Sequence, residues 1–359
     1  MKPVRLLVDS FADANDFNAQ MANARDIVSR LDPAHFHVTM FRCGELDERI
    51  AKRPNTRLIW LPPHGQTFRI LHQFIWGSHQ ILFYIKASPA AKLYLAMRRK
   101  WFDRRIVIGT IESQSDLYNE PTIKEEQIRM WERTILHSDL LFSNSSAVQA
   151  SLEKEYSLRS DVIPTGVDTK FFTPDWNRPA NPRVRVLFVG SLRPFKGPQL
   201  LVRAAAQFPE ADFVIAGEGP MSSDLQVQIL ESHLTNCQLL GGVYGANLRA
   251  QYRAADIFLF PSHWEGSPKV ILEAAASGLP IIARKDYKPE TVIDGQTGYL
   301  GGNDDEVLDR LGRLLAKADL RRHMGRASRV LSDRFDWDLI TREWEQVFLR
   351  EASRQGVRS

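Results

Sequence analysis

Short apolar runs alternate along the whole chain with segments in which apolar residues recur at every third or fourth position. The short runs predict buried strands, and the longer periodic segments, such as 17–31, predict helices. Strict alternation of the two predicts parallel sheets covered by helices on both faces, so the expected fold class is α/β. The expected strands are Val4–Val8, Phe36–Phe41, Leu58–Leu61, Ile81–Ile85, Ile106–Thr110, Leu140–Asn144, Val162–Pro164, Val184–Gly190, Phe213–Gly217, Gln238–Leu240, Ile257–Pro261 and Pro280–Ala283.

The alternation breaks once, at the proline-rich polar stretch FTPDWNRPANPR (172–183), and then begins again. Such a stretch is typical of a linker. We therefore expect two Rossmann-like, doubly wound domains, an N-terminal one over 1–172 and a C-terminal one over 184–335, with 173–183 between them. The remaining 336–359 read as a helix and tail, for which packing back on the N-terminal domain is one arrangement.

The length of 359 residues fits two domains, and 43% hydrophobic residues suffice for packed cores. The two cysteines, Cys43 and Cys237, lie far apart and outside any CxxC pattern, which favours neither disulfides nor zinc and fits a reducing cytoplasm. The most apolar later stretch, Ile70–Ile85, is interrupted by polar residues. It is shorter than the roughly 20 apolar residues of a spanning helix, so no transmembrane segment is expected.

The net charge of +4 is unevenly distributed. Residues 49–105 hold 12 Lys and Arg against one acid, Asp103, which gives this window +11 and leaves −7 for the rest. The window also carries aromatic residues at positions 60, 68, 74, 76, 83, 84, 94, 101 and 102.

Within this window, segment 92–105 predicts an interfacial helix with Leu93, Met97 and Trp101 on one face and Lys92, Arg98 and Arg99 beside it. We expect contact with an anionic membrane surface, and a peripheral location at the cytoplasmic face of the cell membrane. Nucleic acid is the rival partner for such a surface, but the chain contains no recognition module that supports it.

Candidate chemistry lies where the strands of the second domain end, because ligands of doubly wound sheets bind beyond the carboxyl ends of the strands. GSLRPFKG (190–197) follows one strand and is a plausible diphosphate cradle, with Gly190 at the turn and Arg193 and Lys196 ahead of a helix. GEGP (217–220) follows the next strand, and its two glycines leave room for a base or ribose to approach the backbone.

PSHWEGSPKVILEAAASGLP (261–280) carries two glutamates eight positions apart. Gly266 and Pro268 place Glu265 in a loop ahead of a helix, whereas Glu273 lies inside that helix. A helical Glu273 can accept hydrogen bonds from two ribose hydroxyls, and Glu265 can bind sugar hydroxyls. Taken alone, the two residues could equally be an exposed acid and a helix-terminus charge.

Glu265 and Glu273 match the glutamate, seven residues, glutamate motif, and on this basis the chain resembles retaining GT-B glycosyltransferases of the large family GT4. HSDLLFSNSS (137–146), VIPTGVDTKFF (162–172), FVGSLRPFKG (188–197), AGEGP (216–220) and IDGQTGYL (293–300) agree in order and spacing. The resemblance is strong from Val184 to Leu300 and weak before Leu136, the half that binds the acceptor in such enzymes.

The resemblance implies transfer of a sugar, typically a hexose, from a nucleoside diphosphate sugar with retention, without a metal ion or cofactor. The acceptor would be a glycan or lipid-linked molecule, as in polysaccharide or glycoconjugate biosynthesis. Cations and a helix N-terminus can stabilise the departing diphosphate. The catalytic candidates are Glu265, Lys196, Arg193 and Glu112. The expected donor-binding residues are Gly190, Ser191, Arg193, Lys196, Gly217, Gly219, Glu265, Gly266, Ser267, Pro268, Lys269 and Glu273.

The chain departs from the family pattern at several positions. Ser191 stands where the family has arginine, and Arg193 is its possible replacement. No glycine precedes Gly44, so the paired-glycine loop after the first strand is missing. Glu112 stands near the position of a family histidine, with a loop or capping acid as the alternative, and DYKP (286–289) replaces a paired glycine ahead of Glu290.

Two further functional classes follow from these departures and from the sheet type. A catalytically weak subunit that binds nucleotide sugars within a glycan-assembly complex is the main alternative to the transferase. An oxidoreductase is disfavoured because no GxGxxG follows any expected strand.

Overall fold

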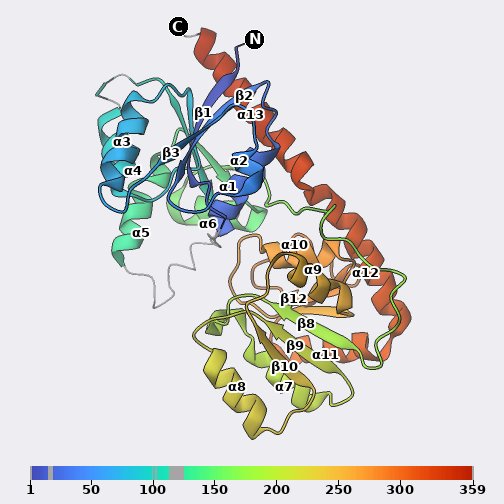
Figure 1. Cartoon of the computed structure of the whole chain (residues 1–359). Coiled ribbons are helices and arrows are strands. Elements are labelled where there is room, and N and C mark those ends of the chain that lie inside the picture. Colours follow the sequence, from blue (N-terminus) through green and yellow to red (C-terminus); the bar gives the residue numbers. More distant parts are fainter. Residues whose placement is uncertain (1, 15–18, 99, 102, 113–124, 358–359) are drawn as a thin grey trace. The chain divides into compact units, whose positions relative to one another are not determined.

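The computed structural model describes residues 2–14, 19–98, 100–101, 103–112 and 125–357 (Figure 1). The chain divides into two compact units. Unit 1 comprises Met1–Thr165 and Trp337–Ser359, and unit 2 comprises Gly166–Asp336. The division falls between residues 165 and 166 rather than between 172 and 173, so the proline-rich stretch 172–183 lies wholly within unit 2.

The described strands of unit 1 form one parallel sheet in the order β3-β2-β1-β4-β5-β6-β7. The order reverses direction between β1 and β4, which is the topological switch point of a doubly wound sheet. The strands are β1 (Val4–Phe11), β2 (Phe36–Arg42), β3 (Thr56–Trp60), β4 (Ile81–Phe83), β5 (Ile106–Ile111), β6 (Leu140–Ser143) and β7 (Asp161–Val162).

Successive residues of the unit 1 strands point to opposite faces, and each face has its own core. Leu6 and Val8 of β1 belong to the core on one face, and Leu7 belongs to the core on the other. The helices that cover the two faces or connect the strands are α1 (Ala19–Arg30), α2 (Glu48–Ala51), α3 (Gln66–Trp76), α4 (Pro89–Arg98), α5 (Glu125–Glu132), α6 (Ser146–Tyr156) and α13 (Trp337–Val357), with a 3₁₀ turn η2 (Ile135–His137).

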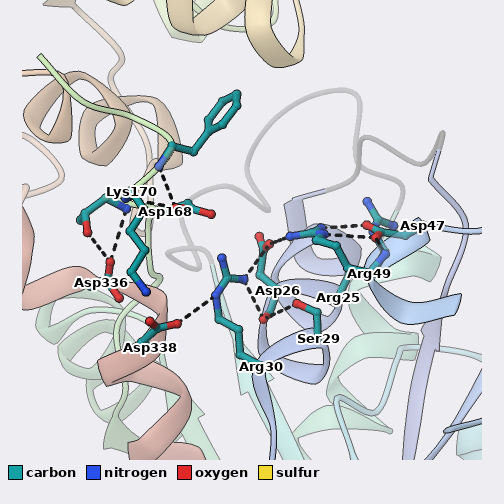
Figure 2. A network of polar contacts seen from close by, with 12 residues as sticks. Arg25, Asp26, Ser29, Arg30, Asp47, Arg49, Asp168, Lys170, Asp336 and Asp338 are labelled. Carbon is teal, nitrogen blue, oxygen red and sulfur yellow. Dashed lines mark hydrogen bonds and ion pairs between the residues drawn. The ribbon is translucent and has the colours of Figure 1, made fainter. Parts of the chain in front are cut away.

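The last helix, α13, belongs to unit 1, where it lies beside α1. Its inner face contributes Trp337, Ile340, Trp344 and Phe348 to the same core as Leu6 and Val8. At the surface, Arg30 of α1 pairs with Asp338 at 3.4 Å and with Asp26 at 3.4 Å (Figure 2). From Asp26 the network of ion pairs continues to Arg49 of α2 and from there to Asp47, the N-cap residue of α2 (Figure 2).

Unit 2 repeats the architecture with one parallel sheet in the order β10-β9-β8-β11-β12-β13, whose switch point lies between β8 and β11. Its strands are β8 (Arg185–Val189), β9 (Asp212–Ala216), β10 (Cys237–Gly241), β11 (Ile257–Phe260), β12 (Ile281–Arg284) and β13 (Gly298–Gly301). Its helices are α7 (Gln199–Gln207), α8 (Ser222–Glu231), α9 (Gly245–Ala254), α10 (Lys269–Ala276), α11 (Asp304–Ala316) and α12 (Ala318–Ser332), with 3₁₀ turns η3 (Pro194–Lys196) and η4 (Asp333–Phe335).

The α/β class and the two Rossmann-like sheets confirm the expected fold, but two local predictions are wrong. Segment 92–105 is not one helix, because α4 ends at Arg98 and Trp101 lies in a turn. Strand β13 was not expected. Its Gly298 packs so closely on Ile281 that a Cβ there would overlap the Ile281 carbonyl group. The strand therefore has glycine where the other strands have apolar side chains, and it lacks the apolar run by which those strands can be predicted.

Candidate active site

The loops that follow β8 and β11 meet at the switch point of unit 2. Lys196 Nζ, in η3 after β8, forms an ion pair and hydrogen bond with Glu265 Oε1, in the loop after β11. Ser262 Oγ donates to the same Glu265 oxygen at 2.7 Å. The two expected catalytic residues therefore lie together, because their strands are neighbours in the sheet.

This ion pair is largely withdrawn from solvent. The side chain of Glu265 is 10% exposed and that of Lys196 is 17% exposed. Lys196 Nζ also lies 5.2 Å from the ring centroid of Phe195 and 5.5 Å from that of Phe260. Because aromatic faces and low exposure reduce screening by water, the pair has stronger electrostatic interactions than a surface pair would have.

The glycine loops after β8 and β9 pack backbone against backbone. Gly190 N donates to Ala216 O at 3.1 Å, and Leu192 N donates to Glu218 O at 2.9 Å. A Cβ at Gly217 would overlap the carbonyl group of Gly190, and one at Gly219 would lie 2.6 Å from Leu192 O. The glycines thus hold the two loops at a separation that side chains would prevent.

Glu273 lies on α10, which begins at Lys269 after Pro268 at the N-cap position, so the loop and helix assignments of Glu265 and Glu273 are both as expected. Tyr252 of α9, fully buried, donates from its hydroxyl to Glu273 Oε2 at 2.9 Å and to Val270 O at 3.2 Å. Burial, followed by the Glu273 charge, raises the pKa of Tyr252 well above its usual value, so its proton stays available for donation.

The other expected donor-binding residues surround this pair at different depths. Gly266 is buried, and Ser267, Pro268 and Lys269 are half-buried at the start of α10. Ser191 and Arg193 are both exposed, and Arg193 is the extended residue at the start of η3. The backbone places Arg193 in the same loop as Lys196.

Three residues of this site were not expected from the sequence, namely Tyr252, Ser262 and Tyr287. Tyr287 is fully buried, and its pKa is raised by burial and then by the Glu265 charge. Ser262 lies two residues after the end of β11, and a polar residue close to a strand end is a signal for a site residue. Tyr252 and Tyr287 carry no such signal, because only the folded packing brings Tyr252 to Glu273 and Tyr287 within the influence of the Glu265 charge.

In unit 1, Glu112 directly follows β5, and its carboxylate accepts hydrogen bonds from two neighbouring elements. Tyr84, just after β4, donates from its hydroxyl to Glu112 Oε1, and Asn23 Nδ2 of α1 donates to Glu112 Oε2 at 3.1 Å. Tyr84 has a left-handed backbone with φ of 61°, which is rare for a bulky residue.

The first loop of unit 1 is built without glycine. Asp13 accepts from Cys43 N at 3.0 Å and from Gly44 N at 2.6 Å, which joins the ends of β1 and β2. Nearby, the buried Asp9 accepts from Lys86 N at 2.9 Å. Burial raises the pKa of Asp9 to about 6, against the opposing effect of Lys86.

Two groups of cations within the basic window 49–105 differ in their surroundings. In the first group, Arg53, Arg98 and Arg105 bond to other segments of unit 1. Arg53 donates to Leu31 O and Phe36 O at 3.1 Å, Arg98 pairs with Asp139 at 2.7 Å, and Arg105 donates to Ile75 O at 3.0 Å. Arg57, Arg69, Lys92, Lys100 and Arg104 are exposed, whereas Arg99 and Phe102 lie outside the described residues.

Two kinds of feature are absent from the described residues. No group of three His, Cys, Asp or Glu side chains there could hold a metal ion. No helix there is both long enough and apolar enough to cross a membrane.

Comparison with known proteins places the same regions in a known context. The family model described as Glycosyl transferases group 1 matches residues 171–330. A D-inositol 3-phosphate glycosyltransferase of Corynebacterium diphtheriae is 30% identical over 321 residues, which cover 79% of this chain and 71% of that protein.

Two solved structures share the fold over nearly the whole chain. Sucrose-phosphate synthase from Thermosynechococcus elongatus has a TM-score of 0.79 at 21% identity and covers 98% of this chain and 100% of that one. Anabaena HepE, solved in complex with UDP-glucose, has a TM-score of 0.74 at 17% identity, with 96% and 99% covered.

Proposed function

Because this chain belongs to the Glycosyl transferases group 1 family, we propose that it transfers a hexose from a nucleoside diphosphate sugar, with retention of configuration, to a glycan or lipid-linked acceptor. The product would serve polysaccharide or glycoconjugate assembly. The Lys196–Glu265 pair at the switch point of unit 2 is the observation that carries this function. A cation and a carboxylate at the place where doubly wound sheets bind ligands suit a substrate with an anionic part and a hydroxylated part.

The geometry of unit 2 supports the following proposed roles in donor binding. The diphosphate binds Lys196, with Arg193 on the same loop and the N-terminus of α10 supplying backbone N–H groups. Glu273, oriented by Tyr252, accepts from the ribose hydroxyls, and Glu265 accepts from the sugar. Glycines 190, 217 and 219 let the nucleotide lie close to the backbone.

The chemical step needs stabilisation of the negative charge that develops on the leaving diphosphate. Lys196 is already held in place by Glu265 and by the aromatic rings, so little reorganisation accompanies charge development. This cation and the α10 N-terminus supply the stabilisation that a metal would otherwise give, so we propose a metal-independent reaction. Glu112 of unit 1 is assigned to the acceptor side.

Release of nucleoside diphosphate from UDP-, GDP- and ADP-sugars tests the function without knowledge of the acceptor. UDP-glucose is the first donor to try, because it is the ligand named for the HepE structure. Wild type should hydrolyse one donor slowly, with equal rates in EDTA and in Mg²⁺. Glu273→Ala should lose at least tenfold in apparent donor affinity, since a hydrogen bond to a charged group contributes about 1.5–3 kcal/mol.

Glu231→Ala is the matched control, because Glu231 is an exposed glutamate on α8 of the same unit. It should behave as wild type. If wild type binds a nucleotide sugar but releases no nucleoside diphosphate from it, the chain is the binding subunit rather than the transferase. Failure to bind any nucleotide sugar refutes both.

We also propose that unit 1 works at an anionic membrane surface on the cytoplasmic side. Helices α3 and α4 pack together, and the exposed side of this region presents Phe68, Trp76 and Trp60, which are 78%, 70% and 45% exposed. No acid occurs between Arg49 and Phe102 in the sequence. Exposed aromatic rings on the same unit as the exposed cations Arg57, Lys92 and Lys100 suit an anionic lipid headgroup layer.

Vesicle sedimentation tests the membrane contact. Wild type should bind phosphatidylcholine vesicles with 30% phosphatidylglycerol more tightly than neutral ones, and Phe68→Ser with Trp76→Ser should abolish the binding. Trp176→Ser is the control, since Trp176 is a half-exposed tryptophan of unit 2. Equal binding to neutral vesicles contradicts the electrostatic part, and tighter binding to single-stranded RNA than to anionic vesicles favours nucleic acid instead.

A further inference from the structure

A small cavity of about 20 Å³ lies inside unit 1 where β5 and β6 end. Polar side chains from separate elements line it, namely Asn23 of α1, Glu112 after β5, Asn144 after β6 and Thr165. Asn23, Asn144 and Thr165 are 4%, 8% and 4% exposed. A cavity of this size has room for one water molecule or one hydroxyl group, because one such group needs about 10–15 Å³.

The orientation of both amides in this cavity is fixed by Glu112. Asn23 Nδ2 donates to Glu112 Oε2 at 3.1 Å, and Asn144 Nδ2 donates to Glu112 O at 3.1 Å. Since a carboxylate and a carbonyl oxygen only accept, neither amide can be turned over without losing its bond. The amide oxygens are therefore the atoms left for the cavity.

Three buried polar atoms at this cavity lack a hydrogen-bond partner among the described residues. They are Asn23 Oδ1, Asn144 Oδ1 and Thr165 Oγ1. Each such atom costs about 1–3 kcal/mol when nothing satisfies it. Three of them around one cavity, beside a carboxylate held by Tyr84, indicate a site formed for a guest that donates hydrogen bonds.

The chemistry of the lining restricts the guest. Two amide oxygens and a carboxylate repel an anion, and an apolar group would leave the three atoms unsatisfied. A hydroxyl group donates one hydrogen bond and accepts others, so it can donate to one of the amide oxygens and accept from the threonine hydroxyl. The backbone of Tyr84 is strained, with φ of 61°. Such strain persists mainly where a functional site requires a side chain to hold one orientation, as Tyr84 does toward Glu112.

We propose that this cavity is a subsite for one hydroxyl group of the acceptor, which makes the acceptor a sugar or polyol at its recognised end. Glu112 acts as a positioning residue that orients the two amides, with Tyr84 holding the carboxylate. This assignment rests on the transferase function proposed above, because it supplies the acceptor side of that reaction.

Thr165→Val tests the subsite because it removes only the hydroxyl and keeps the shape of the side chain. Thr341→Val is the matched control, since Thr341 is a buried threonine of α13 whose hydroxyl also lacks a partner among the described residues but does not line the cavity. Trp337 and Trp344 line the cavity, so their fluorescence reports binding of myo-inositol, methyl α-glucoside and glycerol.

At least one of these polyols should bind wild type and Thr341→Val equally, and should bind Thr165→Val about tenfold more weakly. No binding of any polyol to wild type overturns the subsite, as does equal binding to both variants or stronger binding of methylammonium. A crystal structure at saturating polyol with only a water in the cavity also overturns it. Nucleotide-sugar hydrolysis by wild type and by Thr341→Val keeps this failure separate from failure of the transferase function, because hydrolysis of the donor requires no acceptor.

Discussion

Two glycines at the proposed donor site differ sharply in what a side chain would meet. A methyl group at Gly217 would overlap the backbone of Gly190, whereas one at Gly190 would lie 3.3 Å from the edge of the Phe188 ring. Backbone cannot move aside as a ring can. Gly217→Ala should therefore lower the free energy of unfolding by about 2 kcal/mol and weaken nucleotide binding. Gly190→Ala should stay within about 1 kcal/mol of wild type in urea unfolding, and equal effects of the two substitutions would contradict the loop packing.

His79 gives unit 1 a pH-dependent stability. Burial, followed by repulsion from Arg105, lowers the pKa of His79 from 6.5 to about 3. The folded protein keeps this histidine neutral, whereas the unfolded chain takes up a proton as the pH falls below 6.5. Stability is therefore present above pH 6.5 and is lost on acidification. Between pH 7.5 and pH 5 wild type should lose about 2 kcal/mol more than His79→Asn in urea unfolding. Parallel losses in the two proteins would show that His79 is not buried as described.

At the scale of elements, α9 and α10 are joined at the donor site by one hydroxyl group. Tyr252→Phe removes the bonds to Glu273 Oε2 and Val270 O but keeps the buried ring. Loss of the hydroxyl group should raise the KM for the nucleotide sugar about tenfold with a smaller change in kcat, since we expect donor binding to depend on the orientation of Glu273. Tyr156→Phe, which removes a tyrosine–carboxylate bond to Glu132 in unit 1, should leave the KM unchanged. A kcat loss without a KM change would argue against the role of Tyr252 in positioning.

The elements differ in how well the sequence predicts them. Strands with continuous apolar runs, such as Ile257–Phe260, were expected within one or two residues, because burial on both faces leaves a plain pattern. Segment 92–105 also has a helical pattern, yet α4 ends at Arg98, whose guanidinium pairs with Asp139. The Arg98–Asp139 contact joins residues 41 positions apart and has no effect on the spacing of apolar residues. The helical pattern of the sequence therefore extends beyond the end of α4.

The same distinction applies to the site. The positions of Glu265 and Lys196 at strand ends could be predicted from spacing and from resemblance, and parallel pairing of β8 with β11 then brings them together. The partners Tyr252 and Tyr287 could not, because their roles depend on packing between helices and loops rather than on any motif. Likewise, the cavity at Glu112 depends on Asn23 and Thr165, which are 142 positions apart (165 − 23).

At the scale of the whole molecule, the two units do not follow one another along the chain, because the segment of unit 2 lies between the two segments of unit 1. Unit 1 is completed by α13, which comes last in the sequence, so its folding requires the final segment, whereas unit 2 is continuous from Gly166 to Asp336. Each unit has its own apolar cores. Separate cores predict separate unfolding transitions, of which only that of unit 2 should shift with a nucleotide ligand.

Trp344 of α13 provides the test. Its ring is 3% exposed and lies 4.7 Å from Phe83 of β4 and 4.8 Å from Phe142 of β6, measured between centroids. Trp344→Ala should cost unit 1 about 3–5 kcal/mol and lower its calorimetric transition by about 10 °C, while the transition that rises with UDP stays in place. Trp76→Ala, at a 70% exposed site of the same unit, should leave both transitions unchanged. If both transitions fell together in Trp344→Ala, the two units would unfold as one cooperative body, and α13 would stabilise the whole chain rather than unit 1 alone.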